Sequence, residues 1–206
     1  MFVMLNYFEV FDLPSKLQVD VASLEKQFYA LSRKLHPDRF ASKPVAEQEA
    51  ALAKSSQLND AYRTLKDPIL RTQYLLKLEG VELEEQSKAA TDAARATGEQ
   101  KKQIVPPELL EEVFELNMQL QEMRAAKQMG EDEPELRRDL MTAKDSFDAK
   151  MLETQAELEG LWARWDRAVD ADDESAKAAA RDEMVTLLNK RNYLRNLVRD
   201  VNEALE

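Results

Sequence analysis

Apolar residues recur at helical spacing along most of this chain. Near the start, five of them follow one another at intervals of three and four, so that they share one helix face: Val21, Leu24, Phe28, Leu31 and Leu35. Asp20 is positioned to cap this helix. Pro37 ends it near Leu35, because the residue before a proline avoids the α region. We therefore expect a helix over residues 21–35 with this stripe buried.

Further helices flank this one. A short apolar helix is expected over residues 6–13, before Pro14. After a loop over residues 36–45, a second long helix is expected from about residue 46 to residue 65. Two helices joined in this way pack antiparallel. Pro68 suits the first turn of another helix, and Gly80 suits its C-terminal stop.

The second half of the chain predicts three more helices. The first runs from Pro107 to Met129 and ends at Gly130, and Pro134 opens a much longer one. Carboxylates within residues 170–173 mark a turn into the last helix. Each helix has an apolar face, and short connections between such helices favour an antiparallel three-helix bundle. No alternating pattern predicts a strand, so we expect an all-α fold.

Residues 84–105 differ from both helical regions, because they are polar, alanine-rich and free of aromatic residues. We interpret this stretch as a linker with little fixed structure. The predicted organisation is a helical-hairpin domain over residues 1–80, a linker over residues 81–105 and a three-helix bundle over residues 106–206. Within the bundle, Met151, Trp162 and Trp165 are interpreted as core or as the edge of the core.

The composition of the chain excludes several classes of site and of binding partner. The chain has no cysteine, which excludes disulfides, thiolate metal sites and cysteine nucleophiles. Its net charge of −11 is uneven: residues 1–79 hold 11 Lys+Arg against 10 Asp+Glu, and residues 80–206 hold 18 against 30. An acidic half repels nucleic acid and anionic lipid. No stretch approaches the ~20 apolar residues of a membrane span, and residues 1–5 lack the basic residues of a signal peptide. We expect a cytoplasmic protein that binds neither nucleic acid nor membranes.

The only histidine, His36, precedes Pro37 and Asp38 at the turn between the two long helices. A lone imidazole on a turn suits presentation to a partner better than metal binding or acid–base catalysis. Basic residues gather beside it on the polar face of the preceding helix and in the turn: Lys26, Arg33, Lys34 and Arg39. Opposite charge on a partner would speed encounter and fix orientation. Taken alone, these residues would be interpreted as an ordinary solvated helix face.

This combination resembles a J-domain. The similarity covers residues 5–79: a short apolar helix, a basic helix, the tripeptide His36-Pro37-Asp38 and a return helix with Leu58-Asn59-Asp60-Ala61-Tyr62. Two further segments are similar to the HscB family, the J-type co-chaperones of iron–sulfur cluster biogenesis: Asn6-Tyr7-Phe8-Glu9-Val10-Phe11-Asp12-Leu13-Pro14 and Leu65-Lys66-Asp67-Pro68-Ile69-Leu70. A J-domain followed by an acidic helical bundle also resembles that family's architecture.

The resemblance implies a function without an active site. J-domains bind a DnaK/HscA-type ATPase chaperone and accelerate its ATP hydrolysis. By resemblance, His36, Pro37 and Asp38 enter the contact near the chaperone's interdomain linker. The four basic residues are implied to meet an acidic surface of the chaperone: Lys26, Arg33, Lys34 and Arg39. We expect no catalytic residue, no metal ligand and no cofactor in this chain.

The bundle is implied to hold a second partner, because HscB proteins deliver the iron–sulfur scaffold IscU to the chaperone. The sequence itself shows that the helix over residues 107–129 has a second apolar face, which the bundle core does not need and a partner could cover. Beside its core stripe of Leu109, Val113, Leu116, Leu120 and Met123, a second apolar row comprises Leu110, Phe114 and Met118. The resemblance points to six scaffold-binding residues: Leu110, Phe114, Glu115, Met118, Glu122 and Tyr193.

Alternatives stay open at this point. Glu111 and Met118 depart from the residues usual in the family, and Leu110 and Phe114 could instead be buried against the linker or the J-domain. The protein could also be a J-domain co-chaperone for a different client, with the bundle as an unrelated adaptor. A third possibility is an enzyme that uses scattered carboxylates. Paired acids at a turn, such as Asp172-Asp173, are more often helix caps.

Overall fold

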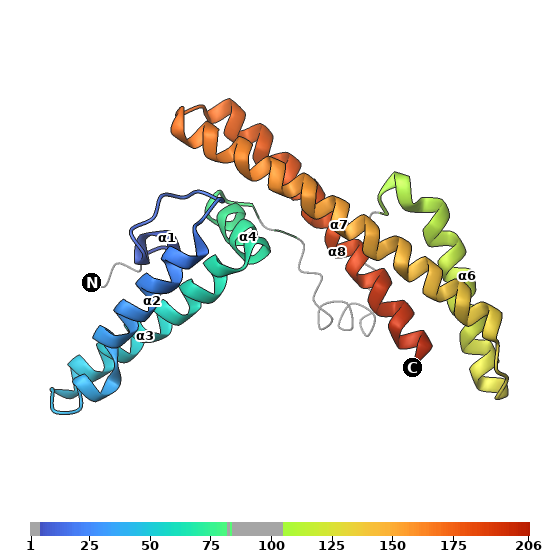
Figure 1. Cartoon of the computed structure of the whole chain (residues 1–206), viewed down its shortest axis with the longest axis horizontal. Helices are drawn as coiled ribbons and strands as arrows, with labels where there is room; N and C mark the ends of the chain where they lie inside the picture. The colour runs from blue at the N-terminus through green and yellow to red at the C-terminus, as the bar shows by residue number, and fades with distance from the viewer. Residues whose placement is uncertain (1–4, 82, 84–104) are drawn as a thin grey trace. The chain divides into compact units, whose positions relative to one another are not determined.

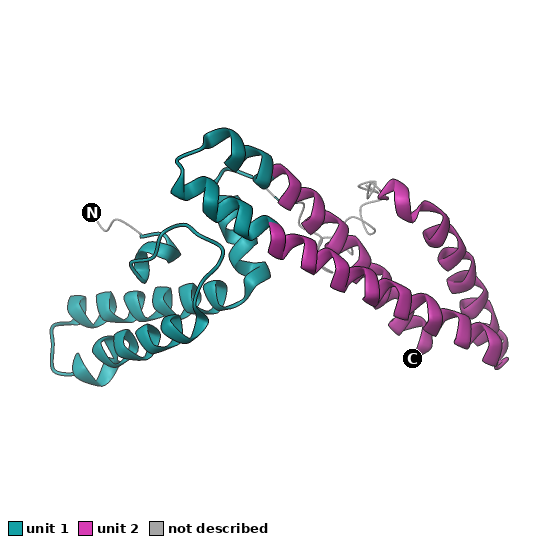
Figure 2. Ribbon diagram, turned by 45° about the horizontal axis from the view of Figure 1, so that its top comes forward, with its two compact units in different colours: residues 1–83, 161–181 teal, residues 84–160, 182–206 magenta. Residues whose placement is uncertain are grey.

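A computed structural model describes residues 5–81, 83 and 105–206. Every regular element within these ranges is helical (Figure 1), so the predicted all-α fold is confirmed. The chain divides into two compact units (Figure 2). Unit 1 comprises Met1–Leu83 and Leu161–Arg181, and unit 2 comprises Glu84–Gly160 and Asp182–Glu206.

The N-terminal part of unit 1 is a helical hairpin with a short helix at either end. Its elements are α1 (Tyr7–Val10), α2 (Val21–Leu35), the 3₁₀ turn η1 (Pro37–Arg39), α3 (Val45–Lys66) and α4 (Pro68–Leu78). Helices α2 and α3 lie side by side and antiparallel, as predicted, and α1 and α4 both pack on α3. The first helix is shorter than predicted, because Asp12 adopts a left-handed backbone with φ of 52°.

Capping groups explain where these helices begin and end. Asp20 and Asp67 each accept hydrogen bonds from two amides in the following helical turn, which satisfies donors that have no partner within the helix. At the end of α4, Gly80 has φ of +78°, a backbone conformation that glycine adopts without strain. The amide of Val81 then donates to the carbonyl of Leu76, which closes a Schellman motif.

The core of unit 1 is buried mainly between α1, α3 and α4. Its fully buried side chains include Phe8, Phe11, Leu17, Leu24, Leu58, Leu65, Leu75 and Leu76. The predicted stripe of α2 is less deeply buried than expected. Of its five residues, only Leu24 is fully buried, and Val21 is exposed. Because α2 packs chiefly on one neighbour, α3, its full apolar stripe is not covered.

Unit 2 is built from the turn η2 (Pro107–Leu109), α6 (Leu110–Met129), most of α7 (Pro134–Asp170) and most of α8 (Glu174–Leu205). The predicted antiparallel three-helix bundle is confirmed. The predicted core stripe of α6 is buried against side chains of α7 and α8 that include Leu140, Phe147, Leu194 and Val201. Gly130 ends α6 with φ of 74°.

Helices α7 and α8 each contribute to both units (Figure 2). Residues 161–181, the turn between these helices and the helical ends beside it, group with the N-terminal hairpin. Most of the predicted linker, residues 81–105, lies outside the described residues, and the domain boundaries at residues 80 and 106 stay predictions. No helix in the described ranges is both long and apolar enough to cross a membrane.

Candidate functional site

The turn between α2 and α3 exposes His36, Pro37 and Asp38. His36 leaves the helix at φ −59° and ψ 132°, the extended conformation that Pro37 imposes on its predecessor. The His36 side chain is 58% exposed and that of Asp38 is 89% exposed. The amide of Asp38 donates to His36 Nδ1 at 3.3 Å. The same nitrogen lies 3.5 Å from a carboxylate oxygen of Asp38, so both polar contacts of the ring are to its neighbour in the turn.

Basic side chains surround this turn. All four predicted chaperone-binding cations are exposed: Lys26, Arg33, Lys34 and Arg39. None of them has an ion-pair partner in the part of the chain that the structure describes. The Arg39 guanidinium donates to the carbonyl of Arg33 at 3.4 Å and so folds back over the end of α2. The structure therefore gathers all seven predicted chaperone-binding residues along α2 and the turn that follows it.

Aromatic packing fixes α2 on α3 beneath these residues. The rings of Phe28 and Tyr62 stack with centroids 4.1 Å apart, and the Tyr62 hydroxyl donates to Glu25 at 3.2 Å. The ammonium of Lys66 lies 5.3 Å from the centre of the Tyr62 ring. A hydrogen bond with Tyr62 raises the pKa of Lys66. This packing sets the direction in which the polar face of α2 points.

The second apolar row of α6 is exposed, whereas its core stripe is buried. The exposed fractions are 56% for Leu110, 69% for Phe114 and 58% for Met118. Glu115 and Glu122 are exposed on the same helix. Five of the six predicted scaffold-binding residues thus share the outer side of α6, where a partner can reach them.

Tyr193, the sixth of these residues, lies elsewhere. Its side chain is 6% exposed and belongs to the core cluster of unit 2. Burial raises the pKa of its phenol, and the charge of Asp200 adds to the effect. Tyr193 is therefore placed to support the bundle from inside, and a direct contact with a scaffold stays a prediction.

Comparison with known proteins gives a family match for the N-terminal part of the chain. The DnaJ domain family matches residues 6–74. The co-chaperone protein HscB homolog of Vibrio cholerae serotype O1 is 46% identical over 79 residues, which are 38% of this chain and 46% of that protein. In this alignment the chain therefore spans about half the length of its curated relative.

Solved structures extend the likeness to nearly the whole chain. Chaperone HscB from Vibrio cholerae has a TM-score of 0.60 and 29% identity, covering 98% of this chain and 100% of that one. Residues 6–74 therefore form a DnaJ domain, and the chain as a whole is similar in fold to an HscB chaperone. The human co-chaperone protein HscB shares the fold, with a TM-score of 0.61 and 24% identity over 98% of this chain and 83% of that one. The suspected resemblance to HscB-type J-domain co-chaperones is thus confirmed.

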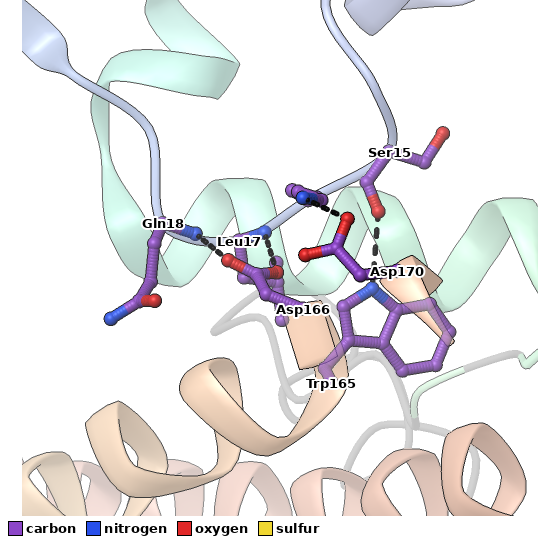
Figure 3. Close-up of polar contacts among 7 residues, drawn as sticks. Ser15, Leu17, Gln18, Trp165, Asp166 and Asp170 are labelled. Carbon is purple, nitrogen blue, oxygen red and sulfur yellow. Dashed lines mark hydrogen bonds and ion pairs between the residues drawn. The ribbon is translucent and has the colours of Figure 1, made fainter. Parts of the chain in front are cut away.

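Unit 1 has a second polar site that the sequence did not predict. Three residues near the end of α7 contact the loop between α1 and α2, residues 11–20 (Figure 3), and we call them the α7 clamp: Trp165, Asp166 and Asp170. The indole Nε1 of Trp165 donates to the carbonyl of Ser15 at 3.1 Å. The Asp170 carboxylate pairs with Lys16 at the surface.

Asp166 makes the central contact of the α7 clamp. Its carboxylate accepts hydrogen bonds from two successive amides, those of Leu17 at 2.7 Å and Gln18 at 2.9 Å. Asp166 is 7% exposed, and Arg71 of α4 is 5% exposed. Burial lowers the pKa of Arg71, and the charge of Asp166 opposes that effect. A buried carboxylate with two donors and a nearby guanidinium is well compensated for its loss of water.

The α7 clamp narrows the interpretation of Trp165, which the sequence left as either core or the edge of the core. This residue is buried against the loop of residues 11–20 in unit 1, and it does not belong to the core of the three-helix bundle. One signal in the sequence could have indicated this. Helix α7 has 37 residues and α6 has 20, so the far part of α7 needs another partner for its apolar face.

Proposed function

We propose that this protein is a cytoplasmic co-chaperone that brings an IscU-like iron–sulfur scaffold to a DnaK/HscA-type ATPase chaperone. The His36-Pro37-Asp38 turn stimulates the chaperone's ATP hydrolysis, and the outer side of α6 holds the scaffold. The chain acts by selecting a conformation of its partner and has no active site of its own.

One observation carries the proposal: His36 is presented outward at the end of a basic helix within a DnaJ domain. The ring is held by a bond to the amide of Asp38, and four cations beside it lack carboxylate partners among the described residues. An acidic partner surface would be attracted to such a helix and oriented by it. The likeness to the HscB homolog and to the HscB structure of Vibrio cholerae supports the choice of client.

Single-turnover ATP hydrolysis by a DnaK/HscA-type chaperone tests the first half of the proposal. The parent protein should accelerate hydrolysis, and His36→Gln should abolish the acceleration with helical content unchanged. Lys43→Gln is the matched control, because Lys43 is also exposed in the turn but is not among the predicted contacts. Loss of helicity in His36→Gln would instead give the histidine a structural role.

Binding of a purified IscU-type scaffold tests the second half. The double variant Leu110→Ala/Phe114→Ala should weaken binding at least ~10-fold, since each truncation removes exposed apolar contact area. A matched control is Met141→Ala/Leu152→Ala, which removes apolar side chains that are 53% and 71% exposed on α7. If the scaffold binds the first variant as tightly as the parent while His36-dependent stimulation persists, the protein is a J-domain co-chaperone for a different client.

A further inference from the structure

A groove of about 430 Å³ runs between α6 and α7 within unit 2. Its floor is apolar and consists of Leu116, Phe147 and Ala143. Its walls are polar: Glu112, Glu115 and Gln119 from α6, and Asp139, Thr142 and Ser146 from α7. An apolar floor between acidic walls is a specific chemical environment, and it indicates what kind of group fits there.

The walls hold more hydrogen-bond acceptors than this chain satisfies. Glu112 pairs with Lys150 at 3.1 Å. Glu115 and Asp139 have no ion-pair partner within the described ranges. A ligand that brings a positive charge and hydrogen-bond donors to these two carboxylates would therefore be favoured.

The chemistry of the groove selects a long basic side chain. Lysine and arginine lay an apolar stem along apolar surface and place a charged head among acceptors. A purely apolar side chain would cover the carboxylates without pairing them, which is unfavourable. Residues 105–206 and the other described residues contain no cluster of three or more metal-binding side chains. An organic cation therefore fits the groove better than a metal ion does.

The groove adjoins the exposed apolar row of α6. Successive residues of a helix are 100° apart, so Glu115 lies between the row that contains Phe114 and the groove wall that contains Gln119. One partner segment can therefore cover the row and reach the groove. We infer that the groove receives a lysine or arginine side chain of the scaffold, and that Asp139 of α7 is a scaffold contact. This inference rests on the proposed scaffold binding.

Substitution of Asp139 tests the inference, with Asp145 as the matched control. Asp145 is an exposed aspartate on the same helix that does not line the groove. Binding of a purified IscU-type scaffold is measured by calorimetry at two salt concentrations. Asp139→Asn should weaken binding about 5-fold and Asp139→Lys at least ~20-fold, because a like charge opposes the incoming cation. The corresponding Asp145 variants should bind within about 2-fold of the parent.

The salt dependence identifies the interaction as an ion pair. Parent binding should weaken with rising salt more steeply than binding by Asp139→Asn, because that variant has one interfacial charge fewer. Equal affinities and equal salt slopes for parent and Asp139→Asn would overturn the inference, and loss of binding in Leu110→Ala/Phe114→Ala would then still support the proposed function. No scaffold binding by the parent would overturn both.

Discussion

Unit 1 contains two loops, one held by contacts among its own residues and their neighbours, the other by contacts with a distant segment of the chain. The turn of residues 36–44 is fixed by its own neighbours, since the amide of Asp38 bonds to His36 and Arg39 bonds back to Arg33. The loop of residues 11–20 is fixed by residues about 150 positions away, through the α7 clamp. His36 is 58% exposed, whereas Leu17 at the centre of the clamped loop is fully buried.

This difference indicates that one loop contributes to the stability of the fold and the other to the recognition of a partner. A loop that binds a partner must leave its polar atoms accessible, and the turn at His36 does so without support from the rest of the unit. A loop buried under another segment contributes to the core, and its contacts are lost only when the unit unfolds. Substitutions at the α7 clamp should therefore change the free energy of unfolding, and substitutions at His36 should change the action on a partner.

The largest effect is expected from Trp165→Ala. The ring is 1% exposed, and removing a buried tryptophan typically costs about 3–5 kcal/mol of unfolding free energy. Urea unfolding followed by circular dichroism measures this loss. Trp165→Phe is the control, because it keeps most of the buried ring area and loses the bond to Ser15. A loss below about 1 kcal/mol for Trp165→Ala would show that the loop of residues 11–20 does not depend on the clamp.

Asp166→Ala should be the next most destabilising change. It leaves the amides of Leu17 and Gln18 without their acceptor and removes the anion near Arg71, at an expected cost of about 2–4 kcal/mol. The same urea experiment applies. Asp145→Ala, an exposed change on the same helix, should stay within about 0.5 kcal/mol of the parent. Equal stabilities for the two variants would contradict the role given to Asp166.

Asp170→Asn tests the exposed edge of the α7 clamp. The Asp170 side chain is 65% exposed, and exposed ion pairs contribute at most about 1 kcal/mol. The variant should lose less than about 1 kcal/mol of unfolding free energy. This loss should become smaller as salt is added, because salt screens exposed charges. A loss as large as that of Asp166→Ala would place the main electrostatic anchor at the surface instead of in the interior.

The smallest stability effect is expected from His36→Gln, which should change unfolding free energy by less than about 0.5 kcal/mol. Combined with Asp166→Ala, it should give an additive result, because the two residues have no contact in common. Thermodynamic coupling between them in a double-mutant cycle would show that the clamp also controls the turn at His36.

The features that the sequence predicted correctly are those that depend on residues close together along the chain. The cap at Asp20, the stop at Gly80 and the exit of His36 from the helix all follow from local backbone rules, and the structure confirms them. Helical periodicity gave the second apolar row of Leu110, Phe114 and Met118 in the same way, and the structure shows that this row is exposed, which the sequence had left open.

Features that depend on the packing of distant segments were not predicted. Nothing local indicates that Asp166 bonds to Leu17, because an aspartate in a long helix is usually solvated. The incomplete burial of α2 and the burial of Tyr193 have the same origin: periodicity gives the direction of a side chain but not the neighbour that covers it. The groove beside Asp139 likewise exists only once α6 and α7 are packed.

Because residues 161–181 belong to unit 1, the compact unit that contains the DnaJ domain is built from two separate stretches of the sequence. Recombination that transfers residues 1–80 to another protein would leave Leu17 in water and two amides without their carboxylate. Such a transferred segment would keep His36-Pro37-Asp38 but would lose the contacts of the α7 clamp with the loop of residues 11–20. Transfer of the whole chain would keep both loops in their present surroundings.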